Sequence, residues 1–327
     1  THGYKPVGSA YPETSIGWYR KHFSIDKKDK DKRFELQFDG IYRNAAIWIN
    51  GFYVGTNFSG YLGNTYDVTD FMNFEGDNVI VIRVDATQAE GWFYEGAGIY
   101  RHVWLNITNK VFIPEDGIFV HSEIKGKNAV TTIETTVQNN YLRNSDGIVY
   151  SYITDRNGKI LTKTSEQKIN LGIRKEVTLK QKVNLNNVRL WSVDDPYLYK
   201  VITVVKSDNQ IVHQTKTRFG IKNVRFDANE GFFLNGKHLK IQGTNNHQDH
   251  AGIGSALPDY LQYYRVKLLK ELGCNAYRAS HNAPTPELLE ACDSLGMLVV
   301  DEQRLLNSSP EYLDQFKRLI KRDRNHA

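Results

Sequence analysis

Residues 221–327 alternate short apolar runs with helical patterns, and this alternation restricts the fold more than any other feature of the chain. The apolar runs stand in LKIQG, NAYRA and MLVV, and each is followed by a stretch with helical periodicity. Successive strands that are joined by helices lie parallel in one sheet. We therefore expect a β-α-β-α-β-α segment, entered through a hairpin at Asn235–Gly236.

The helices of this segment carry clear start and stop signals. Proline near the first helical position and glycine after the last one are typical of helix ends. The starts stand at Pro258–Asp259, Thr285–Pro286–Glu287 and Ser309–Pro310–Glu311, and the stops at Gly273 and Gly296. We expect the first helix to bury an apolar stripe of Leu261, Leu268, Leu269 and Leu272.

Polar clusters follow all three apolar runs, at the expected strand ends. They are Asn245-Asn246-His247, Arg278-Ala279-Ser280-His281-Asn282 and Asp301-Glu302. Because ligands bind beyond the carboxyl ends of parallel strands, three such clusters in succession predict a site. Neither glycine-rich nucleotide motif follows the first strand, which favours a (β/α)₈ barrel over a dinucleotide-binding fold. Such a barrel needs about 250 residues, so we expect only its first part here.

The first two thirds of the chain read as β-structure. Residues 1–110 contain the strand NVIVIRVD and a two-residue hairpin at Asn50–Gly51, with frequent glycines, as in a sandwich of short strands. Residues 111–220 contain alternating TTIETTVQ, a hairpin at Asn157–Gly158 and strands spaced by about ten residues, which favours an immunoglobulin-like sandwich. The predicted domains are therefore 1–110, 111–220 and 221–327.

Composition adds few restrictions. The net charge of +5 and the mixed-sign lysine-rich run near residue 30 give no sign of a nucleic-acid arm. The aromatic share of 12% is better explained by sheet cores than by sugar stacking. Cys274 and Cys292 stand in apolar surroundings, where free thiols are expected.

No apolar stretch approaches the ~20 residues of a membrane helix. We expect a periplasmic or extracellular bacterial protein, with the cytoplasm as an open alternative.

A series of motifs in a fixed order makes the chain recognisable. GWYRKHF, FDGIYRNAAIWINGFYVGTNFSGY and EGAGIYRHVWL come first, followed by LWSVDDPYLYKV and RFGIK, then by FFLNGKHLKIQGTNNHQDHAG, NAYRASHNAPTPELLEACDSLGMLVVDE and RDRNHA. Along its whole length the chain resembles glycoside hydrolase family 2, the group of β-galactosidases, β-glucuronidases and β-mannosidases. The resemblance implies a jelly-roll sugar-binding domain, an immunoglobulin-like domain and the opening of a TIM barrel.

The resemblance also implies a retaining mechanism with two glutamates. One acts as acid/base and the other as the nucleophile, with carboxyl groups ~5 Å apart on either side of the glycosidic bond. In the family the first follows soon after the motif RDRNH and the second lies further on, so both are expected beyond Ala327. No catalytic residue is assigned within the chain. The Asp301–Glu302 pair is expected to be architectural, as is Asp323–His326.

The residues that match the family's substrate side are His247, Arg278 and His281. The resemblance implies that both histidines contact sugar hydroxyls, while Arg278 lies near the nucleophile. Neutral imidazole offers one donor and one acceptor, and a guanidinium lowers the pKa of a nearby carboxylate. Asn282 and Trp92 complete the predicted substrate-binding set. Trp92, with Phe93 and Tyr94, is expected to reach the barrel mouth, with packing inside the sandwich as an equal alternative.

No metal or other cofactor is expected. His247-x-x-His250 lacks a third ligand, and Asp249 and His250 are expected to be structural. Some β-galactosidases of the family hold Mg²⁺ through an acid and a histidine soon after the Asp-Glu pair. Residues 303–308 contain neither residue type. The expected partner is a carbohydrate, rather than nucleic acid or a membrane, and a homo-oligomer is left open.

The leading functional hypothesis is a retaining glycosidase that cleaves terminal β-D-galactosides from oligo- or polysaccharides. A β-glucuronidase or β-mannosidase is the alternative within the family. A noncatalytic carbohydrate-binding or scaffold module is the alternative of another class. Continuation of the reading frame into a tryptophan-rich strand that ends in Asn-Glu would favour the enzyme.

The first prediction concerns residues 1–327 expressed alone. We expect no hydrolysis of a chromogenic β-galactoside, because the two carboxylates of a retaining enzyme act as a unit and loss of either costs many orders of magnitude in rate. Turnover that persists through purification and disappears in a Glu302→Gln variant would contradict both the mechanism and the architectural role of Glu302.

Overall fold

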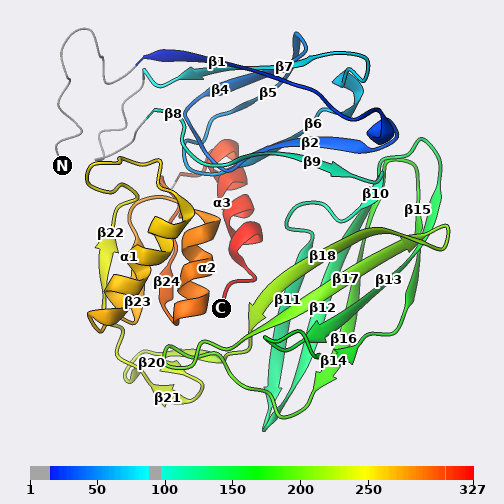
Figure 1. Ribbon diagram of the computed structural model, residues 1–327. Helices are drawn as coiled ribbons and strands as arrows, with labels where there is room; N and C mark the ends of the chain where they lie inside the picture. The colour runs from blue at the N-terminus through cyan, green and yellow to red at the C-terminus, as the bar shows by residue number, and fades with distance from the viewer. Residues whose placement is uncertain (1–14, 88–96, 306) are drawn as a thin grey trace.

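The computed structural model describes residues 15–87, 97–305 and 307–327, and its elements form two β-sandwiches and one parallel α/β unit (Figure 1). The sandwiches and the α/β unit follow one another along the chain and lie around a common centre, close to the last residue of the chain. None of the described helices is long and apolar enough to cross a membrane.

The first sandwich is a jelly roll with two facing antiparallel sheets. One sheet has the order β1 (Ile16–Phe23), β7 (Asn78–Asp85), β4 (Ala45–Ile49), β5 (Phe52–Asn57), and the other β6 (Asn64–Asp67), β2 (Arg33–Phe38), β9 (Val103–Thr108). β3 (Ile41–Tyr42) pairs with β8 (Gly98–Ile99), and short 3₁₀ turns span Lys27–Asp29 and Thr69–Phe71. Asn50 and Gly51 both adopt positive φ, which confirms the predicted hairpin between β4 and β5.

The second sandwich is immunoglobulin-like. In one sheet β12 (Asn128–Asn139) pairs with β10 (Val111–Phe112), β11 (Ile118–Lys125) and β16 (Glu176–Leu185). The other has the order β14 (Ile160–Lys163), β13 (Ser145–Thr154), β17 (Leu198–Ser207), β18 (Gln210–Gly220), and β15 (Gln167–Leu171) also pairs with β13. Alternate residues such as Ile133, Ile153 and Val201 are fully buried between the sheets. This alternation produced the period-two pattern in the sequence.

The α/β unit begins after a small antiparallel sheet of β19 (Val224–Asp227), β20 (Gly231–Leu234) and β21 (Lys237–His238). Its parallel sheet has the order β22 (Gly243–Asn246), β23 (Ala276–Ala279), β24 (Leu298–Val300), and its helices are α1 (Asp259–Glu271), α2 (Pro286–Leu295) and α3 (Pro310–Asp323). Thr285 and Ser309 cap α2 and α3 through their side chains, and Gly296 ends α2 with positive φ. The three predicted βα units of a TIM barrel are thereby confirmed.

The first parallel strand begins later than the apolar run LKIQG predicts. Gly243 is its first residue, and Asn245 and Asn246 lie within the strand rather than after it. A Cβ atom on Gly243 would lie 2.1 Å from the carbonyl oxygen of Ala276, so the pairing with β23 requires glycine at this point. The close approach of two strands, rather than local hydrophobicity, sets where the strand begins.

The expected leucine stripe of α1 is only partly buried. Leu269 packs against the core, but Leu268 and Leu272 are 39% and 80% exposed, and the buried residues of the helix are Gln262 and Val266. Both sets of residues have helical spacing, so the periodicity alone did not distinguish the two faces. Packing against α2 determines which face of α1 is buried, and the face that contacts α2 carries Val266. Cys292 is buried in the same core, and both cysteines are free, as expected.

The immunoglobulin-like sandwich docks on the α/β unit through Trp191 and the end of α3. Trp191 is fully buried, and its Nε1 donates to the carbonyl oxygen of Asp293 on α2 at 2.8 Å. The Asp293 carboxylate accepts from the backbone of Ala327 at 2.7 Å and lies 2.6 Å from Nδ1 of His326. The side-chain amide of Asn325 donates to one backbone carbonyl of β11 and accepts from another backbone amide of that strand. The RDRNH motif therefore joins two domains.

The second prediction concerns the free energy of unfolding. Replacement Trp191→Ala should lower it by about 3–5 kcal/mol, because a large buried side chain is lost and the Asp293 carbonyl loses its donor. The measurement is denaturant unfolding followed by circular dichroism. Replacement Leu142→Ala is the control, since Leu142 is 75% exposed and its loss should have little effect. A cost below about 1 kcal/mol for Trp191→Ala would contradict the docking role.

Candidate functional site

The ends of the three parallel strands meet around the carboxylate of Glu302. Its Oε2 lies 2.8 Å from Nδ1 of His281, and its Oε1 pairs with Nε of Arg278. Arg278 also donates through a terminal nitrogen to Oδ1 of Asn245 at 3.2 Å. The Glu302 carboxylate thus contacts the Arg278 guanidinium from β23 and the His281 imidazole from the loop after β23. The site joins residues of β22, β23 and the segment after β24, which are separated by up to 57 positions between Asn245 and Glu302.

His247 lies beside this group. The centroids of the His247 and His281 rings are 5.9 Å apart, with the rings edge to face. The backbone at His247 and at the next residue is held by Arg265 of α1, which donates to the carbonyl of His247 at 2.5 Å and to that of Gln248 at 3.1 Å. The predicted residues His247, Arg278 and His281 are therefore brought together.

Asp301 and Glu302 face different neighbours, as the alternation of side chains along an extended chain requires. Glu302 contacts Arg278 and His281, whereas Asp301 shares a hydrogen bond with Asp323 of α3. Loss of hydration and the charge of Asp323 raise the pKa of Asp301 to about 7, although part of Asp301 remains accessible to solvent. Two carboxyls that point apart do not flank one glycosidic bond.

The loop that carries Asn282 is tied to the jelly roll. Asn282 is buried, and the next carbonyl, that of Ala283, accepts from Arg101 at 2.9 Å. The same guanidinium donates to the carbonyl of Tyr61 at 2.6 Å and approaches Oε1 of Gln248 at 3.4 Å. The sequence does not indicate that Arg101 and Gln248 meet, because they are 147 positions apart and belong to different domains.

Trp92, Phe93 and Tyr94 lie outside the described residues. Their predicted approach to the barrel mouth, including the place of Trp92 in the substrate-binding set, stays a prediction.

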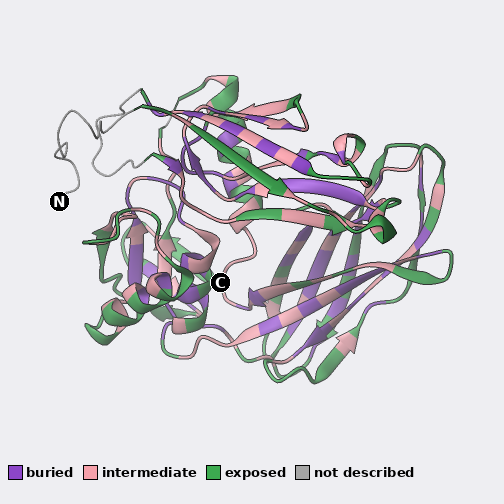
Figure 2. Ribbon diagram, turned by 45° about the horizontal axis from the view of Figure 1, so that its top comes forward, coloured by how far each residue is buried: buried purple, intermediate pink, exposed green. Residues whose placement is uncertain are grey.

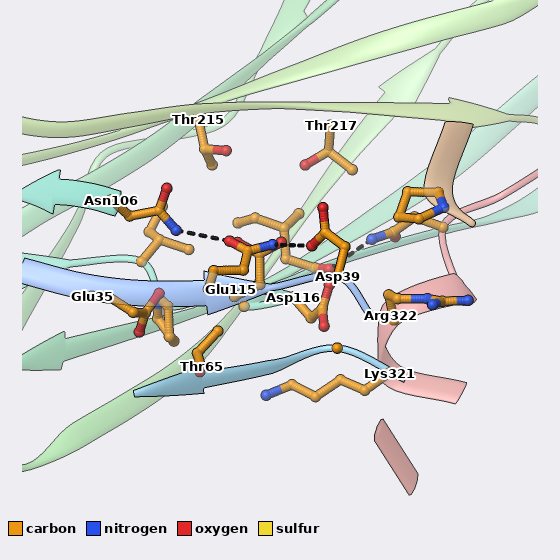
Figure 3. A pocket seen from close by; sticks show the side chains of 18 of the residues that line it. Glu35, Asp39, Thr65, Asn106, Glu115, Asp116, Thr215, Thr217, Lys321 and Arg322 are labelled. Carbon is orange, nitrogen blue, oxygen red and sulfur yellow. Dashed lines mark hydrogen bonds between the residues drawn. The ribbon is translucent and has the colours of Figure 1, made fainter. Parts of the chain in front are cut away.

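A cavity of about 1150 Å³ lies between the three domains and is lined in part by residues of α2 and α3 (Figure 3). Polar side chains from all three domains line it, among them Asn106, Glu115, Thr215 and Lys321. His247, Arg278, His281 and Glu302 do not line it. Ligands of parallel α/β units bind beyond the strand ends, so we place the candidate site there and regard the larger cavity as a domain junction.

Glu115 extends into this cavity, on the segment between β10 and β11 (Figure 3). Glu115 keeps an exposed surface, but the surrounding walls reduce the hydration of its carboxyl, and Asp116, Glu35 and Asp39 add negative charge nearby. Together these effects raise the pKa of Glu115 to about 7. The sequence alone does not single out Glu115, because the cavity walls and two of the acids, Glu35 and Asp39, come from distant parts of the chain.

One group among the described residues has the spacing of metal ligands. Ligand atoms of His102, Asp259 and Glu287 lie within 4.8 Å of one another, with His102 Nε2 2.7 Å from Asp259 Oδ1. The hydrogen bond with Asp259 raises the pKa of His102. An ion pair between His102 and the acids therefore explains why these side chains lie together, without a metal ion. Both acids stand in the first turns of helices, where negative charge is stabilised. In the described parts of the chain, His247 and His250 belong to no such group.

Three family models match the chain in succession. Residues 6–109 match the sugar binding domain of glycosyl hydrolases family 2, residues 111–222 match glycosyl hydrolases family 2, and residues 226–311 match the family's TIM barrel domain.

Individual proteins are similar over nearly the whole chain. The β-galactosidase BoGH2A of Bacteroides ovatus is 37% identical over 98% of this chain and 39% of its own length, and a β-glucuronidase of Formosa agariphila is 30% identical over 86% and 31%. A glycosyl hydrolase family 2 member from Bacteroides cellulosilyticus has a TM-score of 0.90 at 35% identity, over 97% of this chain and 44% of that one. A Bacteroides uniformis β-glucuronidase has 0.89 at 29%, over 97% and 40%. The chain thus spans less than half the length of these relatives.

The third prediction concerns the pH dependence of stability. Folding raises the pKa of Glu115 from 4.5 to about 7. Its contribution is therefore neutral below about pH 4, becomes destabilising as pH rises from 4.5 to 7, and reaches its full penalty above 7. Because the cavity is open to solvent, we expect a penalty of only about 1 kcal/mol. Replacement Glu115→Gln should raise the midpoint of thermal unfolding by ~2–4 °C near pH 8 and leave it unchanged near pH 4.

The matched control for this experiment is Glu176→Gln, at an exposed position of β16. It should change neither midpoint. Equal effects of Glu115→Gln at both pH values would show that the carboxyl is not withdrawn from water in the folded state.

Proposed function

Because the chain belongs to glycosyl hydrolases family 2, we propose that the protein carrying it is a retaining glycoside hydrolase that removes terminal β-D-galactosyl residues. The observation that carries the proposal is the array of Arg278, Glu302 and His281 at the carboxyl ends of parallel strands. Charged and hydrogen-bonding side chains converge there from three strands, at the edge where α/β barrels bind their ligands.

In this proposal His281 binds a sugar hydroxyl. Nδ1 faces the Glu302 carboxylate, which favours the tautomer with its proton on Nδ1. In the neutral ring Nε2 is then the acceptor, suited to a hydroxyl donor of the substrate. His247, edge to face with His281, supplies a second imidazole to the same subsite. The two imidazole rings offer nitrogen atoms that can bind sugar hydroxyl groups.

Arg278 has a different part in the proposal. Its guanidinium is held between Glu302 and Asn245, so its position does not depend on bound substrate. A fixed cation lowers the pKa of a neighbouring carboxylate and so keeps a nucleophile ionised. Retention requires two carboxyls ~5 Å apart. Asp301 and Glu302 face different neighbours, so the proposal assigns neither catalytic role to a residue of this chain.

The choice of galactoside is the finer part of the proposal. It is supported by BoGH2A, which is named a β-galactosidase and is 37% identical to this chain. Several relatives near 30% identity are named β-glucuronidases, which makes glucuronides the alternative substrate. A glucuronide carries a carboxylate that needs a cationic partner. A galactoside carries no such group, so the two substrates differ in whether the site must supply a cation.

Parallel assays with chromogenic β-galactoside, β-glucuronide and β-mannoside test the proposal on the whole protein that contains this chain. We expect the galactoside to have the highest kcat/KM. A higher kcat/KM for the glucuronide would show that glucuronides are the preferred substrate, and the proposed reaction, glycoside hydrolysis, would stand. No hydrolysis of any of the three would favour the noncatalytic carbohydrate-binding module.

The fourth prediction concerns His281 in the whole protein. Replacement His281→Ala should reduce transition-state binding by about 2–4 kcal/mol, measured as the fall in kcat/KM, because a polar contact to the sugar is lost. The matched control is His121→Ala, at an exposed position of β11 in the immunoglobulin-like sandwich. Unchanged kcat/KM in His281→Ala would refute the substrate contact.

A further inference from the structure

The outward sheet of the jelly roll carries exposed aromatic rings. Trp18 on β1 is 63% exposed and Tyr53 on β5 is 56% exposed, with Trp48 of β4 between them and partly exposed. The opposite face of the same sheet is the core, where Ile47 and Ile82 are buried. This sheet lies on the side of the jelly roll that faces away from the helices and from the second sandwich (Figures 1 and 2).

The three rings form a connected row across the strands. The ring centroids of Trp18 and Trp48 are 5.9 Å apart with an interplanar angle of 26°, and those of Trp48 and Tyr53 are 5.7 Å apart. Strand register explains the row, because Trp48 pairs directly with Tyr53, and Trp18 pairs with Arg83 on the strand between β1 and β4. We name Trp18, Trp48 and Tyr53 the aromatic row.

Polar groups border the aromatic row on the same face. Arg83 forms an ion pair with Asp85 at 3.0 Å, and the Tyr53 hydroxyl lies 2.6 Å from Oγ1 of Thr56. Such groups donate to and accept from hydroxyls at the edge of a ring-sized ligand. Aliphatic side chains, which dominate protein interfaces of the core type, are absent from the row itself.

The size of the row distinguishes between classes of partner. A large aromatic side chain buries about 150–250 Å² in full, so the exposed parts of the three rings amount to roughly 300 Å². A stable protein interface needs about 800 Å² on each partner. The three rings alone expose less than half of that area, and their flat, narrow arrangement fits a ligand that is narrow and flat.

We propose that the aromatic row is a binding surface for a polysaccharide chain, which stacks the C–H faces of successive pyranose rings on Trp18, Trp48 and Tyr53. The polar border then binds hydroxyl groups along the chain. This surface is separate from the strand-end site, so it would hold a polymer to the protein without taking part in hydrolysis. It goes beyond the proposed function and does not require that function to be correct.

The experiment is affinity electrophoresis of the whole protein in native gels that contain galactan, mannan or polygalacturonate. We expect at least one neutral polysaccharide to slow migration. Replacements Trp18→Ala and Tyr53→Ala should each weaken the apparent affinity about tenfold, because stacking on one ring is lost. Both side chains are on the surface, and unchanged thermal unfolding midpoints will show that the variants fold.

Two further variants serve as controls. Phe226→Ala removes a 77% exposed ring from another part of the chain and should leave binding unchanged. His121→Ala changes an exposed position of the second sandwich and should also leave it unchanged. Hydrolysis at the strand-end site is assayed separately with the chromogenic glycosides, which separates failure of this proposal from failure of the proposed function. Retardation by none of the polymers, or full retardation of Trp18→Ala, would overturn the proposal. So would a dimer in size-exclusion chromatography that dissociates in Trp18→Ala, since the row would then bind a second copy.

Discussion

The guanidinium of Arg101 is the contact on which the arrangement of the strand-end site depends. Loss of hydration lowers its pKa, so the group must find acceptors within the protein. It donates to the carbonyls of Tyr61 and Ala283 and approaches Gln248. These acceptors belong to the jelly roll, the loop after β23 and the loop after β22, respectively. One side chain thus sets the distance between the first sandwich and two loops that carry candidate substrate contacts.

The second sandwich is held by a different kind of contact. Fully buried Trp191 and the amide of Asn325 connect it to α2 and to the end of α3. Asn325 donates to and accepts from the backbone of β11 much as another strand would. The segment after α3 therefore has its direction set by the immunoglobulin-like domain. In a barrel, that segment leads from one βα unit to the next strand, so the sandwich positions barrel residues without contributing any to the site.

These contacts leave the molecule with two separate faces. The strand-end site has fixed charges, with Glu302 neutralising Arg278 and orienting His281, and so is suited to one sugar in a defined orientation. The outward sheet of the jelly roll has exposed rings and few directional contacts, and so is suited to many positions along a polymer. Between the domains, the cavity near Glu115 has polar walls because strands of both sandwiches present polar side chains to it, such as Glu35, Asn106 and Thr215.

Local signals in the sequence were sufficient for several elements. Asn50–Gly51 predicted its hairpin because both residues tolerate positive φ, and Thr285 with Gly296 predicted the two ends of α2. The polar strand ends predicted that His247, Arg278 and His281 would meet, since parallel strands present their carboxyl ends at one edge. The family motifs supplied the order of the domains.

Contacts between distant residues decided the rest. The buried face of α1 depends on α2, and the start of β22 depends on the carbonyl of Ala276. The pKa of Glu115 depends mainly on the cavity walls that reduce its hydration, and further on nearby acids. The roles of Arg101 and Asn325 as links between domains are of the same kind. By itself the sequence determined the local elements and the residues at the strand ends, because these depend on neighbouring positions and on strand direction. Only the tertiary structure decided which partner each side chain meets, because that depends on how the domains pack.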